Sequence, residues 1–119
     1  MIRPDITLDA VYLYRKPVDM RKQSAGLSAL IEGVLKDDPF SGALFVFCNR
    51  VRDRLKIVYW EKNGFVVWYK HLQEQKFSWP RTESTDSVTI TSEELNWLLD
   101  GYNIFDLKPH RELRYAFAS

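Results

Sequence analysis

Short apolar runs separated by polar turns recur along the chain, a pattern that predicts a sheet of short strands. Ala10–Tyr14 is rich in β-forming residues and is closed by Lys16-Pro17. Leu44–Cys48 is a continuous apolar run, which is typical of a central strand covered on both faces. Val88–Thr91 is a candidate for a further strand near the C-terminal end. The predicted hairpin and helices lie between or beside these three runs.

Two longer runs flank a turn signal and predict a β-hairpin. They cover about Arg52–Trp60 and Phe65–Leu72, and Asn63-Gly64 between them supplies the two positive-φ positions of a type I′ turn. Because side chains alternate along a strand, Leu55, Ile57 and Tyr59 would point together toward a core. With the preceding strand, the hairpin forms an antiparallel meander.

Helical spacing of apolar residues predicts one long helix. We expect it to cover Met20–Leu35, with Asp19 accepting hydrogen bonds from the free N–H groups of the first turn. The apolar positions recur at i, i+3, i+4, i+7 and i+8 and form a single stripe. They are Leu27, Leu30, Ile31, Val34 and Leu35.

A second, shorter helix is indicated by a capping box. Thr91 and Glu94 stand three residues apart, as the reciprocal hydrogen bonds of that motif require. Leucines then follow at helical spacing until Gly101 stops the helix. The leucines are Leu95, Leu98 and Leu99.

The order of these elements favours a single α+β domain. We expect an antiparallel β-meander sheet of roughly four to five strands, with one long and one short helix on one face. The chain has 119 residues, a length suited to one domain. Residues 1–101 would form the compact core, and the tail 102–119 has no predicted structure. No repeat, linker or low-complexity tract divides the chain.

Charge is distributed unevenly although the formal net charge is only +1. Residues 1–81 hold 14 Lys and Arg against 9 Asp and Glu, a net of +5, whereas residues 82–119 hold 3 against 7, a net of −4. A cationic body suggests an anionic partner, and the acidic part suggests a protein contact. The alternative is that the two parts neutralise each other within the fold.

Cysteine content and hydropathy predict the cellular compartment of the protein. Cys48 is the only cysteine, so no internal disulfide is possible and no oxidising compartment is implied. The sequence shows no apolar run of signal-peptide length and no window that approaches a membrane span. We therefore expect a cytoplasmic protein without membrane contact.

A row of cations is the main candidate for a binding surface. Arg50, Arg52, Arg54 and Lys56 stand at every second position, so one face of a strand would carry them about 6–7 Å apart. That spacing suits successive phosphates of a nucleic-acid strand, which arginine can bind bidentately. Aromatic neighbours would stack on bases or pack beside them. The full candidate set is Arg50, Arg52, Arg54, Lys56, Arg21, Lys22, Trp60, Trp68, Tyr69 and Lys70.

The alternative to binding is that the row is a solvated strand face. Its cations would then pair with Asp53, with Glu61 or with the acidic C-terminal part. Lysine and arginine on a strand also deter unwanted edge-to-edge pairing of sheets. The sequence leaves both readings open.

Catalytic and metal-binding patterns are weak by comparison. His71 and His110 are far apart, Cys48 has no partner at metal-ligand spacing, and Cys48 ends an apolar strand where a buried thiol is inert. Glu74-Gln75-Lys76 with a distant Asp53 has the residue types of a metal-dependent nuclease site, but it lies in a polar turn. No phosphate-binding glycine loop, nucleophile elbow or zinc-peptidase motif occurs. We expect no cofactor and no metal.

Several sequence blocks follow one another in an order typical of a known family. They are Val18–Lys22, Asp38–Gly42, Leu44–Phe47, Asn49-Arg50, Arg52–Arg54, Lys56-Ile57, Tyr59-Trp60, Gly64-Phe65, Trp68–Lys70, Phe77–Pro80 and Leu98–Gly101. Together they resemble the TnpB accessory protein encoded beside the transposase in the bacterial insertion-sequence-66 family. The resemblance covers nearly the whole chain.

The resemblance implies a role in DNA transposition beside a separate transposase, and it supplies no active site. This chain departs from the family pattern at Ala25, where an acid is common, and at Cys48 and Val51, where a further basic residue is common. We therefore expect a non-enzymatic accessory protein that contacts transposon ends, the transposase, or other element-encoded proteins. The alternatives are an adaptor that binds only protein and, third, a metal-dependent nuclease.

Overall fold

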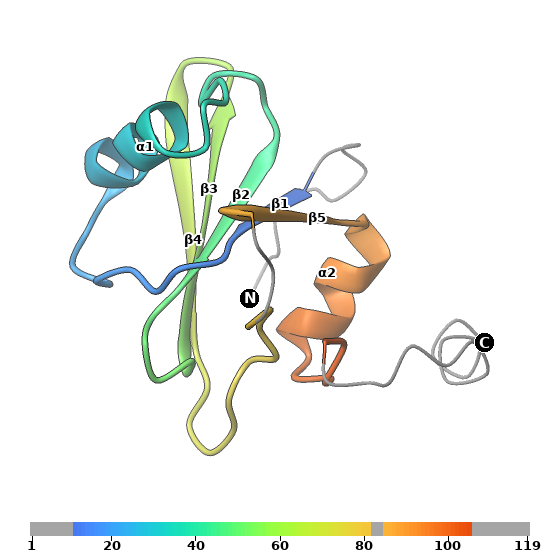
Figure 1. Ribbon diagram of the computed structural model, residues 1–119. Coiled ribbons are helices and arrows are strands. Elements are labelled where there is room, and N and C mark those ends of the chain that lie inside the picture. Colours follow the sequence, from blue (N-terminus) through green and yellow to red (C-terminus); the bar gives the residue numbers. More distant parts are fainter. Residues whose placement is uncertain (1–10, 82–84, 106–119) are drawn as a thin grey trace.

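The computed structural model describes residues 11–81 and 85–105 and has an α+β fold, which confirms the predicted class. Predicted strands and helices are all present, with shifted boundaries (Figure 1). In chain order the elements are β1 (Val11–Tyr14), α1 (Ser24–Gly33), β2 (Leu44–Cys48), β3 (Arg54–Glu61), β4 (Gly64–His71), β5 (Ser87–Ile90) and α2 (Ser92–Leu99).

The described residues form one five-stranded sheet in the order β4-β3-β2-β1-β5. The pairs β2–β3, β3–β4 and β1–β5 are antiparallel, as expected, but β1 and β2 run parallel, with Val11 opposite Leu44. A parallel pair needs a long crossover connection, and α1 with its flanking segments provides it. The sheet is therefore mixed and mostly antiparallel.

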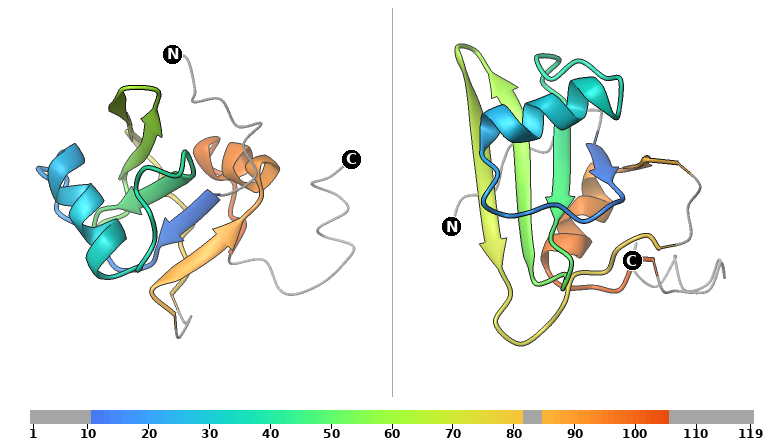
Figure 2. Two further views of the ribbon diagram at one scale, coloured as in Figure 1. Left: turned by 90° about the horizontal axis from the view of Figure 1, so that it is seen from above. Right: turned by 60° about the vertical axis from the view of Figure 1, so that its left-hand side comes forward.

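The two helices lie on opposite faces of the sheet, so the expectation that both cover one face is wrong (Figure 2). On one face α1 buries Leu27 and Ile31 against Phe45, Phe47 and Val58. On the other face the buried leucines of α2 pack with alternate residues of the same strands. That second cluster includes Leu95, Leu98, Leu99, Val46 and Ile57. A strand buried on both faces, such as β2, explains the continuous apolar run in its sequence.

The helix α1 is shorter than its apolar periodicity indicates. It begins at Ser24, and Gln23 stands at its N-cap without a side-chain cap. Asp19 therefore does not cap it, contrary to the prediction. Residues 15–23 instead form an irregular connection with a turn at Met20 and Arg21, tied to the sheet where the Val18 N–H donates to the Cys48 carbonyl at 2.9 Å.

Two predictions from short sequence motifs, the capping box of α2 and the turn of the β3–β4 hairpin, have different outcomes in the structure. The capping box is confirmed, because the Glu94 N–H donates to Thr91 Oγ1 and the Thr91 N–H donates to Glu94 Oε1, both at 3.0 Å. Gly101 follows with φ of 91°. The hairpin turn, by contrast, consists of Lys62 and Asn63, one position before the predicted pair, and Lys62 adopts φ of 53°.

Candidate nucleic-acid interface

An open groove of about 890 Å³ lies on the α1 face of the sheet. One wall is the connection from β1 to α1, another is the turn from β2 to β3, and its floor is the hairpin of β3 and β4. Its lining residues are Val18, Asp19, Met20, Arg21, Gln23, Ser24, Asn49, Arg50, Val51, Arg54, Lys56, Val67 and Tyr69. We call this the cationic groove.

Positive charge dominates the cationic groove. Arg21, Arg50, Arg54 and Lys56 line it, and Asp19 is the carboxylate among the described lining residues. These cations come from separate segments of the chain. The fold brings these cations together, whereas a single strand with cations at every second position would set them in a line. This cluster of positive charge makes the groove a candidate site for anions.

The turn from β2 to β3 is organised by the side chain of Asn49. Its Nδ2 donates to Asp53 Oδ1 at 2.7 Å, and its Oδ1 accepts from the N–H groups of Asp53 and Arg54 at 3.1 and 3.0 Å. These bonds replace a regular strand at this point. Arg50 therefore lies in the turn, while Arg54 begins β3.

Asp53 contacts partners other than the arginines with which it would pair under the alternative to binding. Besides Asn49, it lies 3.4 Å from His71 Nε2. The hydrogen bond from the Asn49 side chain, with a smaller contribution from His71, lowers the pKa of the Asp53 carboxyl. Within residues 11–81 and 85–105, neither Arg50 nor Arg54 forms an ion pair, and both are exposed.

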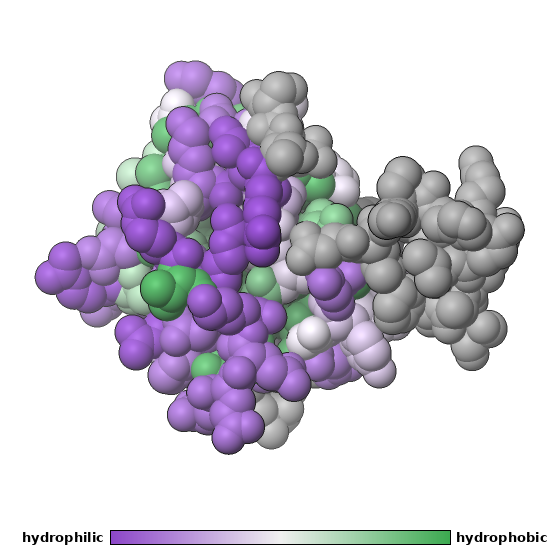
Figure 3. Space-filling view, turned by 60° about the horizontal axis from the view of Figure 1, so that its bottom comes forward, coloured by the Kyte–Doolittle hydropathy of each residue, from purple (hydrophilic) through white to green (hydrophobic). Residues whose placement is uncertain are grey.

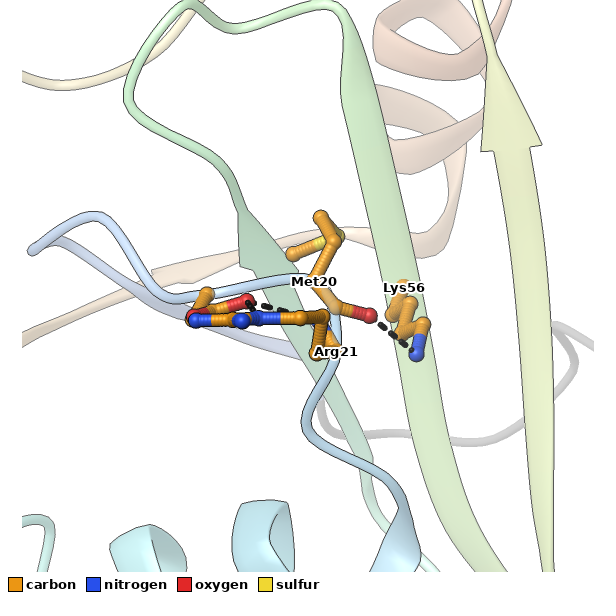
Figure 4. A network of polar contacts seen from close by, with 4 residues as sticks. Met20, Arg21 and Lys56 are labelled. Atoms are coloured by element: carbon orange, nitrogen blue, oxygen red, sulfur yellow. Dashed lines mark hydrogen bonds and ion pairs between the residues drawn. The ribbon is translucent and has the colours of Figure 1, made fainter.

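Lys56 is fixed in place by main-chain carbonyl groups. Its Nζ donates to the carbonyl oxygen of Met20 (Figure 4) and to that of Lys22, both at 2.8 Å. Neutral acceptors leave the positive charge of the ammonium uncompensated. The same Nζ lies 6.0 Å from the centre of the Tyr69 ring, the residue opposite Lys56 on β4. Lys56 thus joins the β1–α1 connection to the hairpin floor.

Arg21 and Asp19 form an exposed ion pair at the mouth of the groove. The Arg21 Nη2 donates to Asp19 Oδ2 at 2.6 Å, and its Nε donates to both carboxylate oxygens at 3.0 Å. Hydrogen bonding by this guanidinium lowers the pKa of Asp19 to about 2. The charge of Arg21 is therefore offset by its own neighbour, unlike those of Arg50 and Arg54.

The N-terminus of α1 also opens on the groove. Gln23 and Ser24 belong to its lining, and the first turn of α1 has no side-chain cap and no acidic residue. The unsatisfied N–H groups at a helix start carry partial positive charge. This adds to the positive potential that the side chains create.

Five of the predicted site residues lie outside the groove lining. The prediction that the cations form a single row along one strand is wrong. Arg52 adopts φ of 66° in the turn, and its Nη1 is buried without a partner among the described atoms. Its carbonyl oxygen accepts from the Phe77 N–H at 2.7 Å. The positive φ at Arg52 breaks the strand alternation on which the row depended. Lys22 is exposed and contributes its carbonyl group to Lys56.

The remaining three contribute to packing. Trp68 lies on the α2 face against the core. Lys70 lies on that face too, where its Nζ donates to the Leu99 carbonyl at 2.7 Å and so caps the end of α2. Trp60 shares the face of Lys56, but it packs edge-on against Phe40 and Phe65, with ring centres 5.0 and 5.1 Å away. Of the predicted aromatic residues, Tyr69 is the one in the groove.

Sequence reasoning missed the residues that shape the groove. Asn49 could have been found, because an asparagine four residues before an aspartate in a polar stretch is a turn signal. The pairing of Asp19 with Arg21 is also local. Val18, Met20 and Val67 carry no such signal, since only the folded chain brings them to the groove.

The surrounding surface is mostly polar. The end of the sheet that bears the turns after β2 and β4, at the bottom of Figure 1, is covered largely by hydrophilic residues with small hydrophobic patches (Figure 3). One ion pair between the two oppositely charged parts of the chain is present away from the groove, between Lys16 and Asp86 at 3.7 Å.

Features that would point to metal or thiol chemistry are weak in the described residues. Within 11–81 and 85–105, no group of three or more His, Cys, Asp or Glu gathers to hold a metal ion. Cys48 is buried, and burial raises the pKa of its thiol to about 12. The described helices include none with the length and apolar character to cross a membrane. His110 and the tail 106–119 lie outside the described residues.

Comparison with known proteins decides the relationship. The family model described as IS66 Orf2 like protein matches residues 9–109. The chain belongs to this family. The uncharacterized protein y4jC of Sinorhizobium fredii (strain NBRC 101917 / NGR234) is 35% identical over 86 residues, 72% of this chain and 73% of that protein. The uncharacterized protein y4hO of the same strain is 32% identical over 91 residues, 76% and 78% of the two chains. No solved structure matches.

Membership confirms the resemblance seen in the sequence and gives the chain an accessory role associated with transposition. The match covers every described strand and helix and all lining residues of the cationic groove.

Proposed function

We propose that this member of the IS66 Orf2-like family is a non-enzymatic accessory protein that contacts transposon DNA, with phosphates bound in the cationic groove. The observation that carries the proposal is the pair of exposed arginines, Arg50 and Arg54. They line the groove beside Lys56 and have no ion-pair partner in the described part of the chain.

The chemistry of these residues suits phosphate. An arginine guanidinium presents a planar set of donors that matches two phosphate oxygens. Lys56 is already fixed by two carbonyl groups, so a phosphate would meet an ammonium that needs no further ordering. The uncapped start of α1 places further positive potential on the same groove.

A protein adaptor is the second candidate function, and an aromatic cluster with one exposed ring and two half-buried rings favours it. Phe40 is 54% exposed and packs against Trp60 and Phe65 at the tip of the hairpin. An exposed apolar patch of this kind is typical of protein contacts. We infer the transposase as the partner, because the family is associated with transposition. The acidic C-terminal part, residues 82–119, would also serve this function, and its residues 85–105 are described.

The deciding experiment is a binding titration with element-end DNA that has both a duplex part and a single-stranded tail. Fluorescence anisotropy of labelled DNA would be measured for the wild type and for the double variant Arg50→Ala/Arg54→Ala. Each hydrogen-bonded charge contact contributes about 1.5 kcal/mol or more, so the double variant should lose about 100-fold in affinity at low salt.

Arg81→Ala provides the matched control, because Arg81 is an exposed arginine outside the groove lining. It should bind as the wild type does. Circular dichroism would verify that each variant is folded. If the wild type does not bind this DNA, the proposal fails, and co-purification of the transposase would then favour the adaptor.

A further inference from the structure

The cationic groove has an apolar and aromatic side as well as a charged one. Tyr69, Val67 and Val51 line it and are 42%, 36% and 54% exposed. An exposed aromatic ring finds no base face to stack on at the outside of a DNA duplex, where contacts go to phosphates, sugars and base edges. An unpaired strand presents phosphates and also base faces that stack on aromatic side chains.

The shape of the groove agrees with this difference. It is open to solvent and has a volume of about 890 Å³. Such a space accepts a base with its sugar. An intact duplex has no unstacked base to insert, so it contacts the rim alone.

Tyr69 is positioned as a rigid stacking surface. It lies within β4, where it pairs directly with Lys56 of β3, and Lys56 is itself fixed by two carbonyl groups. The Lys56 Nζ lies 6.0 Å from the ring centre, and the residue is still 42% exposed, so part of the ring is free for a base. Arg54, two residues before Lys56 on the same face of β3, lies about 6–7 Å along the strand from it.

We propose that the groove binds an unpaired DNA strand, with a base stacked on Tyr69 and flanking phosphates on Arg50 and Arg54. This inference rests on the proposed function, because it names the form of DNA that the same groove takes. It assigns Tyr69 a direct contact with the base, and Arg50 and Arg54 the contacts with the backbone.

The test compares three labelled probes of equal length by anisotropy: a single strand, the same strand with abasic sites, and a blunt duplex. The single strand should bind most tightly. Loss of a stacked base weakens binding by roughly 5- to 150-fold, so the abasic strand should show a loss in this range with wild-type protein. This comparison needs no variant and so does not depend on correct folding of one.

Variants then assign the effect to Tyr69. Tyr69→Leu should weaken single-strand binding by the same roughly 5- to 150-fold and leave abasic and duplex binding unchanged. Tyr69→Phe keeps the ring and should bind as the wild type does. Tyr102→Leu, at a tyrosine 50% exposed outside the groove lining, is the matched control.

Two outcomes distinguish a failure of this inference from a failure of the proposed function. Equal binding of single strand and duplex that depends on Arg50 and Arg54 but not on Tyr69 would overturn the inference and support the proposed function. Binding to none of the probes would overturn both.

Discussion

Each face of the β3–β4 hairpin carries a hydrogen-bonded lysine, and the two lysines have different roles. On the α2 face, Lys70 donates to the Leu99 carbonyl and closes the helix, beside a Trp68 packed into the core. On the α1 face, Lys56 donates to the carbonyl groups of Met20 and Lys22, beside an exposed Tyr69. One face is sealed by its helix, and the other keeps a groove.

The difference arises from where each helix lies. Three fully buried leucines of α2 pack on the lower end of the sheet, which Lys70 reaches. The helix α1 crosses the upper half of the sheet as drawn in Figure 1 and leaves the lower half of the hairpin to the β1–α1 connection. The position of each lysine relative to its helix thus separates the ammonium group that caps α2 from the one that lies in the groove.

The largest effect should come from the sealed face. Leu98→Ala removes a fully buried side chain beneath α2, so the free energy of unfolding should fall by about 2–5 kcal/mol. Val67→Ala, at a residue 36% exposed on the groove face, should cost less than about 1 kcal/mol. Urea unfolding followed by circular dichroism measures both. Equal losses would contradict the contrast between the faces.

The two lysines give the next largest effect and a sharper contrast. Lys56→Met removes two hydrogen bonds from a charged donor, each contributing about 1.5 kcal/mol, so the unfolding free energy should fall by about 3 kcal/mol. Lys70→Met removes one, and should cost somewhat less. Only Lys56→Met should also weaken DNA binding by anisotropy. A comparable loss of binding in Lys70→Met would show that the groove is not the DNA site.

A smaller effect is expected at the mouth of the groove. Asp19→Asn removes the carboxylate that offsets Arg21, so the positive charge available to phosphate rises. Affinity for DNA should increase, and the slope of log affinity against log salt should steepen by up to about 0.9. Asp38→Asn, at an exposed aspartate outside the groove lining, is the control and should leave the slope unchanged.

The smallest effect is a pH dependence at the same pair. Because the Arg21 hydrogen bonds lower the pKa of Asp19 to about 2, the pair should be fully formed above the ordinary aspartate pKa. Its contribution to stability should be lost as pH falls from about 4 through about 2. Carboxyl-carbon NMR should give this midpoint, and Arg21→Ala should return it to the ordinary value. An ordinary midpoint in the wild type would show that the pair does not form.

Much of the fold follows from local sequence signals. The apolar run of β2, the alternation in β3 and β4 and the capping box of Thr91 are written in short segments, and the structure confirms each. The opposite placement of the helices was missed. A strand–helix–strand order indicates a parallel pair with a crossover, so the parallel pairing of β1 and β2 was within reach of the sequence.

The groove was less predictable because its cations are brought together by tertiary structure. Arg50 and Arg54 were identified, but the alternation that named them also named Arg52, which the Asn49 turn directs elsewhere. Likewise, Lys56 and Lys70 look alike in the sequence. Their different partners, Met20 and Leu99, are 36 and 29 residues away. Spacing along a strand cannot show such contacts.

The salt dependence of DNA binding tests most directly whether the groove cations bind phosphate. Log affinity for element-end DNA would be plotted against log salt for the wild type, for Arg50→Ala/Arg54→Ala and for the Arg81→Ala control. Each phosphate contact contributes about 0.9 to the slope on duplex DNA and about 0.7 on a single strand. The double variant should flatten the slope by about 1.4–1.8, and the control should leave it unchanged. An unchanged slope in the double variant would contradict the assignment of the groove as the DNA site.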